Sequence, residues 1–191
     1  RGYMSKLKVV DNALGILLDG LEERNMLEDT VIVLFADHYP YAIPKSNLTK
    51  AYGYDVEKDN DAERVPFIIY NPELEAKKID AYTEHVNTTP TLANLFDLSF
   101  DSRLYLGSDV LDNNYESIVI FDDGSWKNEY VYYDASKNKA SYYTQKVYSD
   151  TEILAINEKI SLKLKMSSQA IKSNYFSYLE NLLNDYNQKE E

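Results

Sequence analysis

Apolar residues recur along the first part of the chain with two different periods. In residues 5–25 they are spaced three and four positions apart and charged residues fill the other face, which predicts an amphipathic helix. Residues 31–36 form an unbroken apolar run that is too short for a helix and rich in β-branched side chains, so we expect a strand buried on both faces. A helix, a short loop and a buried strand form half of a βαβ unit, which favours an α/β fold.

A second apolar run, at residues 65–70, predicts another buried strand, with Pro66 at its start or on an edge. The residues between the two runs, 39–64, are polar and begin at the carboxyl end of the first strand. A loop of that length at that place is typically functional or mobile.

Residues 88–96 predict a short helix. Thr88 or Thr89 would cap its N-terminus, and Pro90 would lie in its first turn. The side chains expected on its buried face are Leu92, Leu95 and Phe96.

Beyond about residue 102 the pattern changes to short β-prone runs. These runs are residues 117–121, 129–133 and 141–148, and turn-forming residues separate them, which predicts an antiparallel meander. The segment from residue 150 onward is helical again, capped by Ser149 or Asp150, with a break or bend at Ser167 and Ser168. We therefore divide the chain into residues 1–112, a portion of an α/β domain, and residues 113–191, a small antiparallel sheet with a C-terminal helix.

The amino-acid composition excludes several classes of function. The chain has 191 residues and a formal net charge of -12, which argues against nucleic acid as a partner because phosphate backbones need stripes of Lys and Arg. It has no cysteine, which excludes thiol catalysis and disulfides. No apolar run is long enough to span a membrane, and the chain starts at Arg1 without an initiator Met, so we interpret it as a piece of a longer protein.

Asp37 and His38 directly follow the first predicted strand. Open α/β sheets bind their ligands beyond the carboxyl ends of such strands, and a carboxylate beside an imidazole is a natural ligand pair for a divalent metal. The alternative is that Asp37 caps a helix and His38 is a surface residue.

Two further residues are candidates for substrate binding. His85 precedes the helix at residues 88–96, and Arg64 precedes the second predicted strand. The alternatives are a structural role for His85 and, for Arg64, a surface ion pair with Glu63 or Asp61.

Several segments resemble one family. Asp37-His38-Tyr39 resembles the metal-binding segment of lipoteichoic acid synthases, in the sulfatase-like branch of the alkaline phosphatase superfamily. Four further segments match the family in the same order: residues 65–69, 85–92, 105–111 and 118–126. The resemblance extends from the first helix to about residue 148.

The resemblance implies part of an alkaline phosphatase/sulfatase-like sandwich. It implies a metal-dependent phosphoglycerol transferase acting on phosphatidylglycerol-type headgroups, with Asp37 and His38 as ligands of Mn²⁺ or Mg²⁺, or alternatively Zn²⁺. It places the parent protein on the extracellular face of a bacterial cell membrane, anchored by upstream transmembrane helices. The partners implied are the phospholipid headgroup and the N-terminal half of the same protein.

The chain departs from the family in three respects. The family's nucleophilic Thr and its first acidic metal ligand lie upstream of the Asp-His pair, so we expect both to be missing and this chain alone to be inactive. Asn87 stands where the family usually has Asp, and Pro40 stands where Gly is common. Two alternatives stay open: a sulfatase or phosphoethanolamine transferase of the same superfamily, and a non-catalytic interaction domain that retains the fold.

Overall fold

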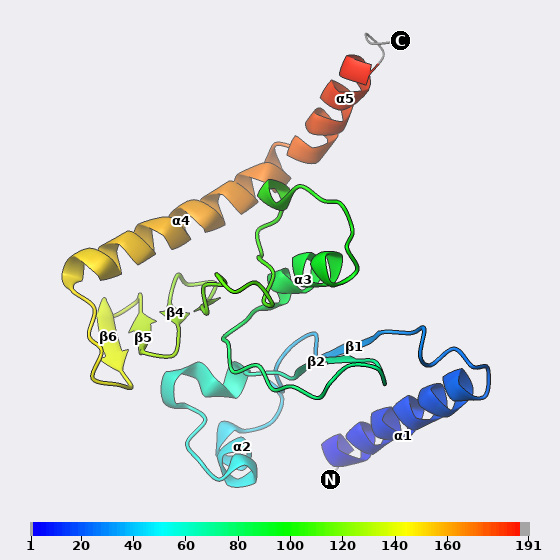
Figure 1. Ribbon diagram of the computed structural model, residues 1–191. Helices are drawn as coiled ribbons and strands as arrows, with labels where there is room; N and C mark the ends of the chain where they lie inside the picture. Colours follow the sequence, from blue (N-terminus) through cyan, green and yellow to red (C-terminus); the bar gives the residue numbers. More distant parts are fainter. Residues whose placement is uncertain (1, 188–191) are drawn as a thin grey trace. The chain divides into compact units, whose positions relative to one another are not determined.

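The computed structural model describes residues 2–187, without the side chains of residues 59, 60, 185 and 187 (Figure 1). By its internal contacts the chain forms two compact units, Arg1–Ile79 and Asp80–Glu191. We call them the N-terminal unit and the C-terminal unit and describe each by itself. The predicted division between residues 112 and 113, based on the change in sequence pattern, stays a prediction.

The N-terminal unit contains a two-stranded sheet and several helices. Its elements are α1 (Gly2–Glu22), β1 (Ile32–Phe35), α2 (Lys45–Tyr52), the 3₁₀ helix η1 (Lys58–Glu63) and β2 (Phe67–Tyr70). The amphipathic helix and both strands lie where the sequence predicts them. α1 ends just before Asn25, whose φ of 53° is a left-handed conformation that Asn tolerates.

The expectation that β1 is buried on both faces is wrong for the described part of the chain. β1 pairs antiparallel with β2, from Ile32 opposite Tyr70 to Phe35 opposite Phe67. The side chains of Phe35 and Ile68 are about half exposed, at 49% and 50%. A two-stranded ribbon leaves its apolar faces open unless another element covers them, and no element among residues 2–187 buries this ribbon on both sides.

The segment predicted as a long polar loop is partly folded. Leu48 of α2 packs with Val56 and Ala62 into a small buried cluster, joined by Ile43. Gly53 ends α2 in a left-handed conformation, with φ 78°. The sequence did not predict this cluster, because Leu48, Val56 and Ala62 are far apart in the segment and their spacing matches neither a helix nor a strand.

The C-terminal unit combines a meander with two long helices. Its elements are η2 (His85–Asn87), α3 (Thr88–Leu95), η3 (Ser102–Leu104), β3 (Val119–Ile120), β4 (Trp126–Lys127), β5 (Val131–Asp134), β6 (Lys139–Tyr142), α4 (Asp150–Lys172) and α5 (Tyr175–Asn187). The strands follow the order β3-β4-β5-β6 and all neighbours are antiparallel, so the predicted meander is confirmed.

Helix α4 covers one face of the meander. Trp126, Val131 and Tyr133 pack with Ile160 of α4 to form the buried core of this unit. The indole N–H of Trp126 donates to Asn157 Oδ1 at 2.8 Å, which satisfies the one polar atom that the ring brings into the core.

The ends of α4 agree in part with the sequence. Ser149, one of the two predicted caps, is the N-cap, and the structure shows that it also forms a capping box with Glu152. The predicted break at Ser167 and Ser168 is wrong, because α4 continues to Lys172. The chain turns instead at Asn174, which has φ 53°; serines inside a helix are tolerated, whereas a left-handed residue ends it.

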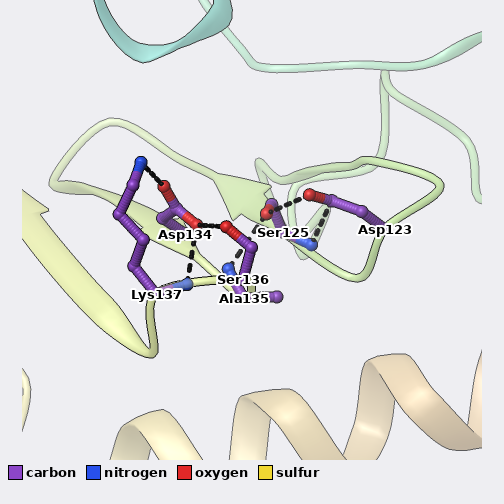
Figure 2. A network of polar contacts seen from close by, with 6 residues as sticks. All are labelled: Asp123, Ser125, Asp134, Ala135, Ser136 and Lys137. Atoms are coloured by element: carbon purple, nitrogen blue, oxygen red, sulfur yellow. Dashed lines mark hydrogen bonds and ion pairs between the residues drawn. The ribbon is translucent and has the colours of Figure 1, made fainter.

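Two turns of the meander are joined through the buried residue Ser125, shown in Figure 2. Its hydroxyl donates to Asp123 Oδ2 at 2.9 Å and accepts the backbone N–H of Ala135 at 3.0 Å. Its own backbone N–H donates to Asp123 Oδ1 at 2.8 Å. The turn between β3 and β4 is thereby fastened to the turn between β5 and β6.

The second of these turns is stabilised by Asp134 (Figure 2). Its carboxylate accepts hydrogen bonds from Lys137 Nζ at 2.7 Å and from the Ser136 hydroxyl at 2.6 Å. The bonds from Lys137 and Ser136 lower the pKa of Asp134 to about 2. The residues predicted as a turn, 134–138, therefore form one, and the Asp134 carboxylate also accepts the backbone N–H of Lys137 at 3.0 Å.

Candidate metal centre

Asp37 and His38 lie just beyond the carboxyl end of β1, where the sequence predicts them. Both side chains are open to solvent: that of Asp37 is 88% exposed and that of His38 is 53% exposed. His38 Nε2 lies 3.6 Å from Asp37 Oδ1. The two potential donor atoms are therefore side by side, close enough to contact one cation.

The other ring nitrogen of His38 has a defined partner. Nδ1 lies 2.8 Å from the carbonyl oxygen of Tyr39. A carbonyl oxygen only accepts hydrogen bonds, so this contact requires the proton on Nδ1. In the neutral imidazole the lone pair is then on Nε2, the atom beside Asp37, and that is the protonation state a metal ligand needs.

The donor set fits part of a divalent metal site. An imidazole nitrogen and a carboxylate oxygen suit Mn²⁺, Mg²⁺ and Zn²⁺ to different degrees. A stable site needs three or more protein ligands, and residues 2–187 contain no group of three or more His, Cys, Asp or Glu side chains arranged to hold a metal. Asp37 and His38 thus present two potential donor atoms, fewer than a stable metal site needs.

The two candidate substrate-binding residues lie apart in the chain. Arg64 belongs to the N-terminal unit, where it is exposed just before β2, and its backbone N–H donates to Asp61 O at 3.2 Å. His85 opens η2 in the C-terminal unit. Of the four candidates, the structure brings together Asp37 and His38, and the roles of Arg64 and His85 stay predictions.

Asn87 has a structural role that the sequence did not reveal. It is 3% exposed, and it precedes α3 as the N-cap, in place of the predicted Thr88 or Thr89. Its side-chain amide donates to Thr83 Oγ1 at 3.1 Å and to Tyr115 Oη at 3.0 Å, and its Oδ1 accepts the backbone N–H of Ser108 at 2.8 Å. Because these bonds use both amide hydrogens, an Asp at this position could not replace them all.

Gly107 lies directly against the same turn. A Cβ added to Gly107 would lie 2.0 Å from the carbonyl oxygen of Val86, a distance that no real Cβ tolerates. Near this contact, the Thr91 hydroxyl accepts the Val110 N–H at 3.0 Å and donates to Asn87 O at 2.7 Å. The family-like segments 85–92 and 105–111 are thus interlocked by backbone contact and buried hydrogen bonds.

This interlock also explains which face of α3 is buried. The buried residues are Pro90, Thr91 and Ala93, whereas Leu95 and Phe96 are 36% and 51% exposed. The prediction that Leu95 and Phe96 are buried is wrong, because the face of α3 that packs against residues 105–111 requires small and polar side chains. The sequence signal for this close packing is the Gly in residues 105–111 together with a Thr in the middle of a short helix.

Glu84, the residue before His85, is partly buried within the C-terminal unit. Burial raises its pKa, while the charge of Lys163 and a hydrogen bond from the Ile120 backbone N–H, at 3.4 Å, oppose that rise. Glu84 and Lys163 are among the residues that line a polar cavity of about 300 Å³. The carboxylate connects η2 to β3 and faces α4, so it contributes to the packing of three segments.

Comparison with known proteins places the chain in a family. The sulfatase family model matches residues 1–98, about half of the 191 residues. The chain is 21% identical to lipoteichoic acid synthase 2 of Bacillus subtilis (strain 168) over 93% of its own length and 28% of that protein. It is 22% identical to lipoteichoic acid synthase of Staphylococcus aureus (strain USA300) over 94% of its length and 28% of that protein.

A further relative, lipoteichoic acid synthase of Staphylococcus saprophyticus, is 25% identical over 65% of this chain and 20% of its own length. The chain therefore spans under a third of the length of these curated relatives. Across the described residues, none of the helices combines the length and apolar character needed to span a bilayer. The matched region contains β1, β2 and α3, and with them Asp37, His38, Arg64 and His85. The resemblance and the α/β fold predicted from the sequence are confirmed, and the chain belongs to the sulfatase family.

Proposed function

We propose that this chain is the C-terminal portion of a metal-dependent phosphoglycerol transferase acting on phosphatidylglycerol-type lipid headgroups. The observation that carries the proposal is the Asp37–His38 pair, with Nε2 and Oδ1 3.6 Å apart beyond β1 and inside the region that matches the sulfatase family. The names of the relatives, lipoteichoic acid synthases, support the choice of a glycerophosphate substrate.

Asp37 would bind the cation through its carboxylate and His38 through Nε2. A divalent cation held there, Mn²⁺ or Mg²⁺ or alternatively Zn²⁺, supplies Lewis-acid polarisation of a phosphoryl oxygen. The negative charge of Asp37 offsets part of the cation's charge, and the Tyr39 carbonyl keeps the His38 ring in one orientation. Arg64 and His85 would contact the anionic headgroup.

The remaining ligand and the nucleophilic Thr would come from the N-terminal half of the parent protein. Phe35 and Ile68 are half exposed on opposite faces of the β1–β2 ribbon, so each face offers apolar surface against which that half could pack. This chain alone would be inactive and bind metal weakly, because two ligands seldom hold a metal. The parent would act at the extracellular face of a bacterial membrane, anchored by helices outside this chain.

The test uses the longer parent protein and labelled phosphatidylglycerol. Release of diacylglycerol is measured with and without added Mn²⁺ for wild type, Asp37→Asn and His38→Gln. We expect either substitution to lower the rate by about 100-fold or more, since even residues that only support metal ligands contribute 10–100-fold. Asp29→Asn is the matched control, because Asp29 is an exposed residue before β1, and this variant should retain activity. Near-normal rates in both variants would exclude the pair as metal ligands.

A second candidate is a sulfatase-type hydrolase, favoured by the sulfatase family match. An aryl sulfate ester offered to the same preparation separates the two candidates. Hydrolysis of this ester without release of diacylglycerol would favour the sulfatase. A folded parent that binds no metal and turns over neither substrate would favour the non-catalytic domain.

A further inference from the structure

The residues just after His38 form a tight turn that holds its side chain. The carbonyl oxygen of Tyr39 accepts two hydrogen bonds, one from His38 Nδ1 at 2.8 Å and one from the backbone N–H of Tyr41 at 2.8 Å. A bond from the N–H of one residue to the carbonyl two residues earlier closes a γ-turn. Pro40 occupies the central position of this turn.

Proline suits that central position for a physical reason. Its ring fixes φ at about −65°, close to the value of about −75° at the centre of an inverse γ-turn. The Pro40 carbonyl in turn accepts the backbone N–H of Ile43 at 2.9 Å, so the chain beyond the turn is also held. The direction of the Tyr39 carbonyl is therefore set by a rigid residue rather than by a flexible loop.

The turn also brings an aromatic ring onto the imidazole. The ring centroids of His38 and Tyr41 are 4.7 Å apart with their planes at 45°. The centroids of Tyr39 and Tyr41 are 6.2 Å apart in a T-shaped arrangement. Tyr41 is 68% exposed, so burial does not hold it in place. Its position follows from the turn and from contact with the two neighbouring rings.

We infer that Pro40 and Tyr41 are positioning residues for His38. The turn directs the Tyr39 carbonyl at Nδ1 and so selects the tautomer with the proton on that nitrogen. Tyr41 limits rotation of the ring, and the lone pair of Nε2 then lies on the side of Asp37 before any cation arrives. The part of this inference that concerns the cation rests on the proposed function, whereas the tautomer and the turn do not.

The tautomer can be measured on this chain without metal. It has two histidines, so long-range ¹H–¹⁵N spectra at a pH where imidazole is neutral give two patterns, assigned by His38→Gln. We expect the Nδ1–H form for His38 in wild type and a shift towards a mixture of tautomers in Pro40→Gly. Tyr41→Leu, a second variant that leaves the turn intact, should keep the tautomer and broaden the ring resonances. Pro72→Ala, an exposed proline in the same unit, and Tyr52→Leu are the matched controls and should resemble wild type.

Added Mn²⁺ then separates this inference from the proposed function. Paramagnetic broadening should reach His38 at a lower Mn²⁺ concentration than His85, and Pro40→Gly should need several-fold more Mn²⁺ for the same broadening. An Nε2–H pattern for His38 in wild type, or an unchanged pattern in a folded Pro40→Gly variant, overturns the positioning role whatever Mn²⁺ does. The expected tautomer change with no effect of Mn²⁺ on His38 supports the positioning of the ring and counts against the proposed metal ligand.

Discussion

The two units of the chain differ in how they are stabilised. The N-terminal unit carries the candidate metal ligands, yet α1 has no buried residue and the buried cluster consists of Leu48, Val56 and Ala62. The C-terminal unit contains Trp126 and Tyr133 stacked at 5.6 Å, packed under α4, together with the Asn87 hydrogen bonds. The candidate metal ligands therefore lie in the unit with the smaller buried cluster, whereas the larger buried core lies in the other.

The largest expected effect is that of Trp126→Ala. Trp126 is fully buried, and removing so large a side chain from a core costs about 3–5 kcal/mol. Urea unfolding followed by far-ultraviolet circular dichroism should show loss of the C-terminal unit. The exposed Phe96, changed to Ala, should cost under about 1 kcal/mol. If the two variants are equally stable, the core around Trp126 is not what stabilises the C-terminal unit.

Gly107→Ala should be the next most damaging. The added Cβ would meet the backbone of Val86 and push apart two segments, for a cost of about 3 kcal/mol in the free energy of unfolding. Gly15→Ala is the matched control, because nothing lies within 4 Å of its added Cβ and Ala favours a helix by about 1 kcal/mol over Gly. Chemical denaturation of both should give changes of opposite sign. A neutral Gly107→Ala would contradict the close crossing.

Asn87→Asp should have a smaller cost, of about 2 kcal/mol. It places a carboxylate in a buried position that lines the same cavity as Glu84, and it removes the two amide donors. Because burial raises the pKa of such a carboxyl, the loss of stability should be larger at pH 8 than at pH 5. Thermal unfolding at both pH values tests this, with the exposed Asn114→Asp as the control. An equal loss at both pH values would show that charge is not the cause.

The smallest effect expected is that of Glu84→Gln. The folded-state pKa of Glu84 is raised above its ordinary value of 4.5, chiefly by burial. The wild type therefore loses stability as pH rises from that value through the folded-state pKa, and the neutral Gln avoids this loss. Unfolding curves across this range should diverge in favour of the variant as pH increases. A variant that is less stable at neutral pH would mean that the attraction of Lys163 outweighs the cost of burial.

Local signals in the sequence predicted the local features. The apolar runs predicted β1 and β2, and Ser149 or Asp150 was predicted as the cap at the start of α4, which Ser149 forms. The adjacent Asp37 and His38 were predicted at the end of β1 because the end of an apolar run is visible in one sequence.

Features that depend on distant parts of the chain could not be predicted. The contact of Gly107 with Val86 and the hydrogen bond between Asn87 and Ser108 join segments about 20 residues apart. The spacing of apolar residues along the chain does not indicate that two such distant segments are in contact. The antiparallel pairing of β1 and β2 depends on which strands are available as partners. The turn at Pro40 is local, yet its consequence for His38 requires the direction of one carbonyl group, which residue types alone do not specify.

The position of the single tryptophan has a practical consequence. Trp126 lies in the core of the C-terminal unit, with the ring of Tyr133 stacked on it. The ring of Tyr148 forms a T-shaped contact with Trp126, with the two ring centroids 6.4 Å apart. The residues of that core all belong to the C-terminal unit, so tryptophan fluorescence, excited directly or by energy transfer from these tyrosines, reports the packing of that core. An optical assay of folding based on it therefore needs a second probe placed beside Asp37 and His38.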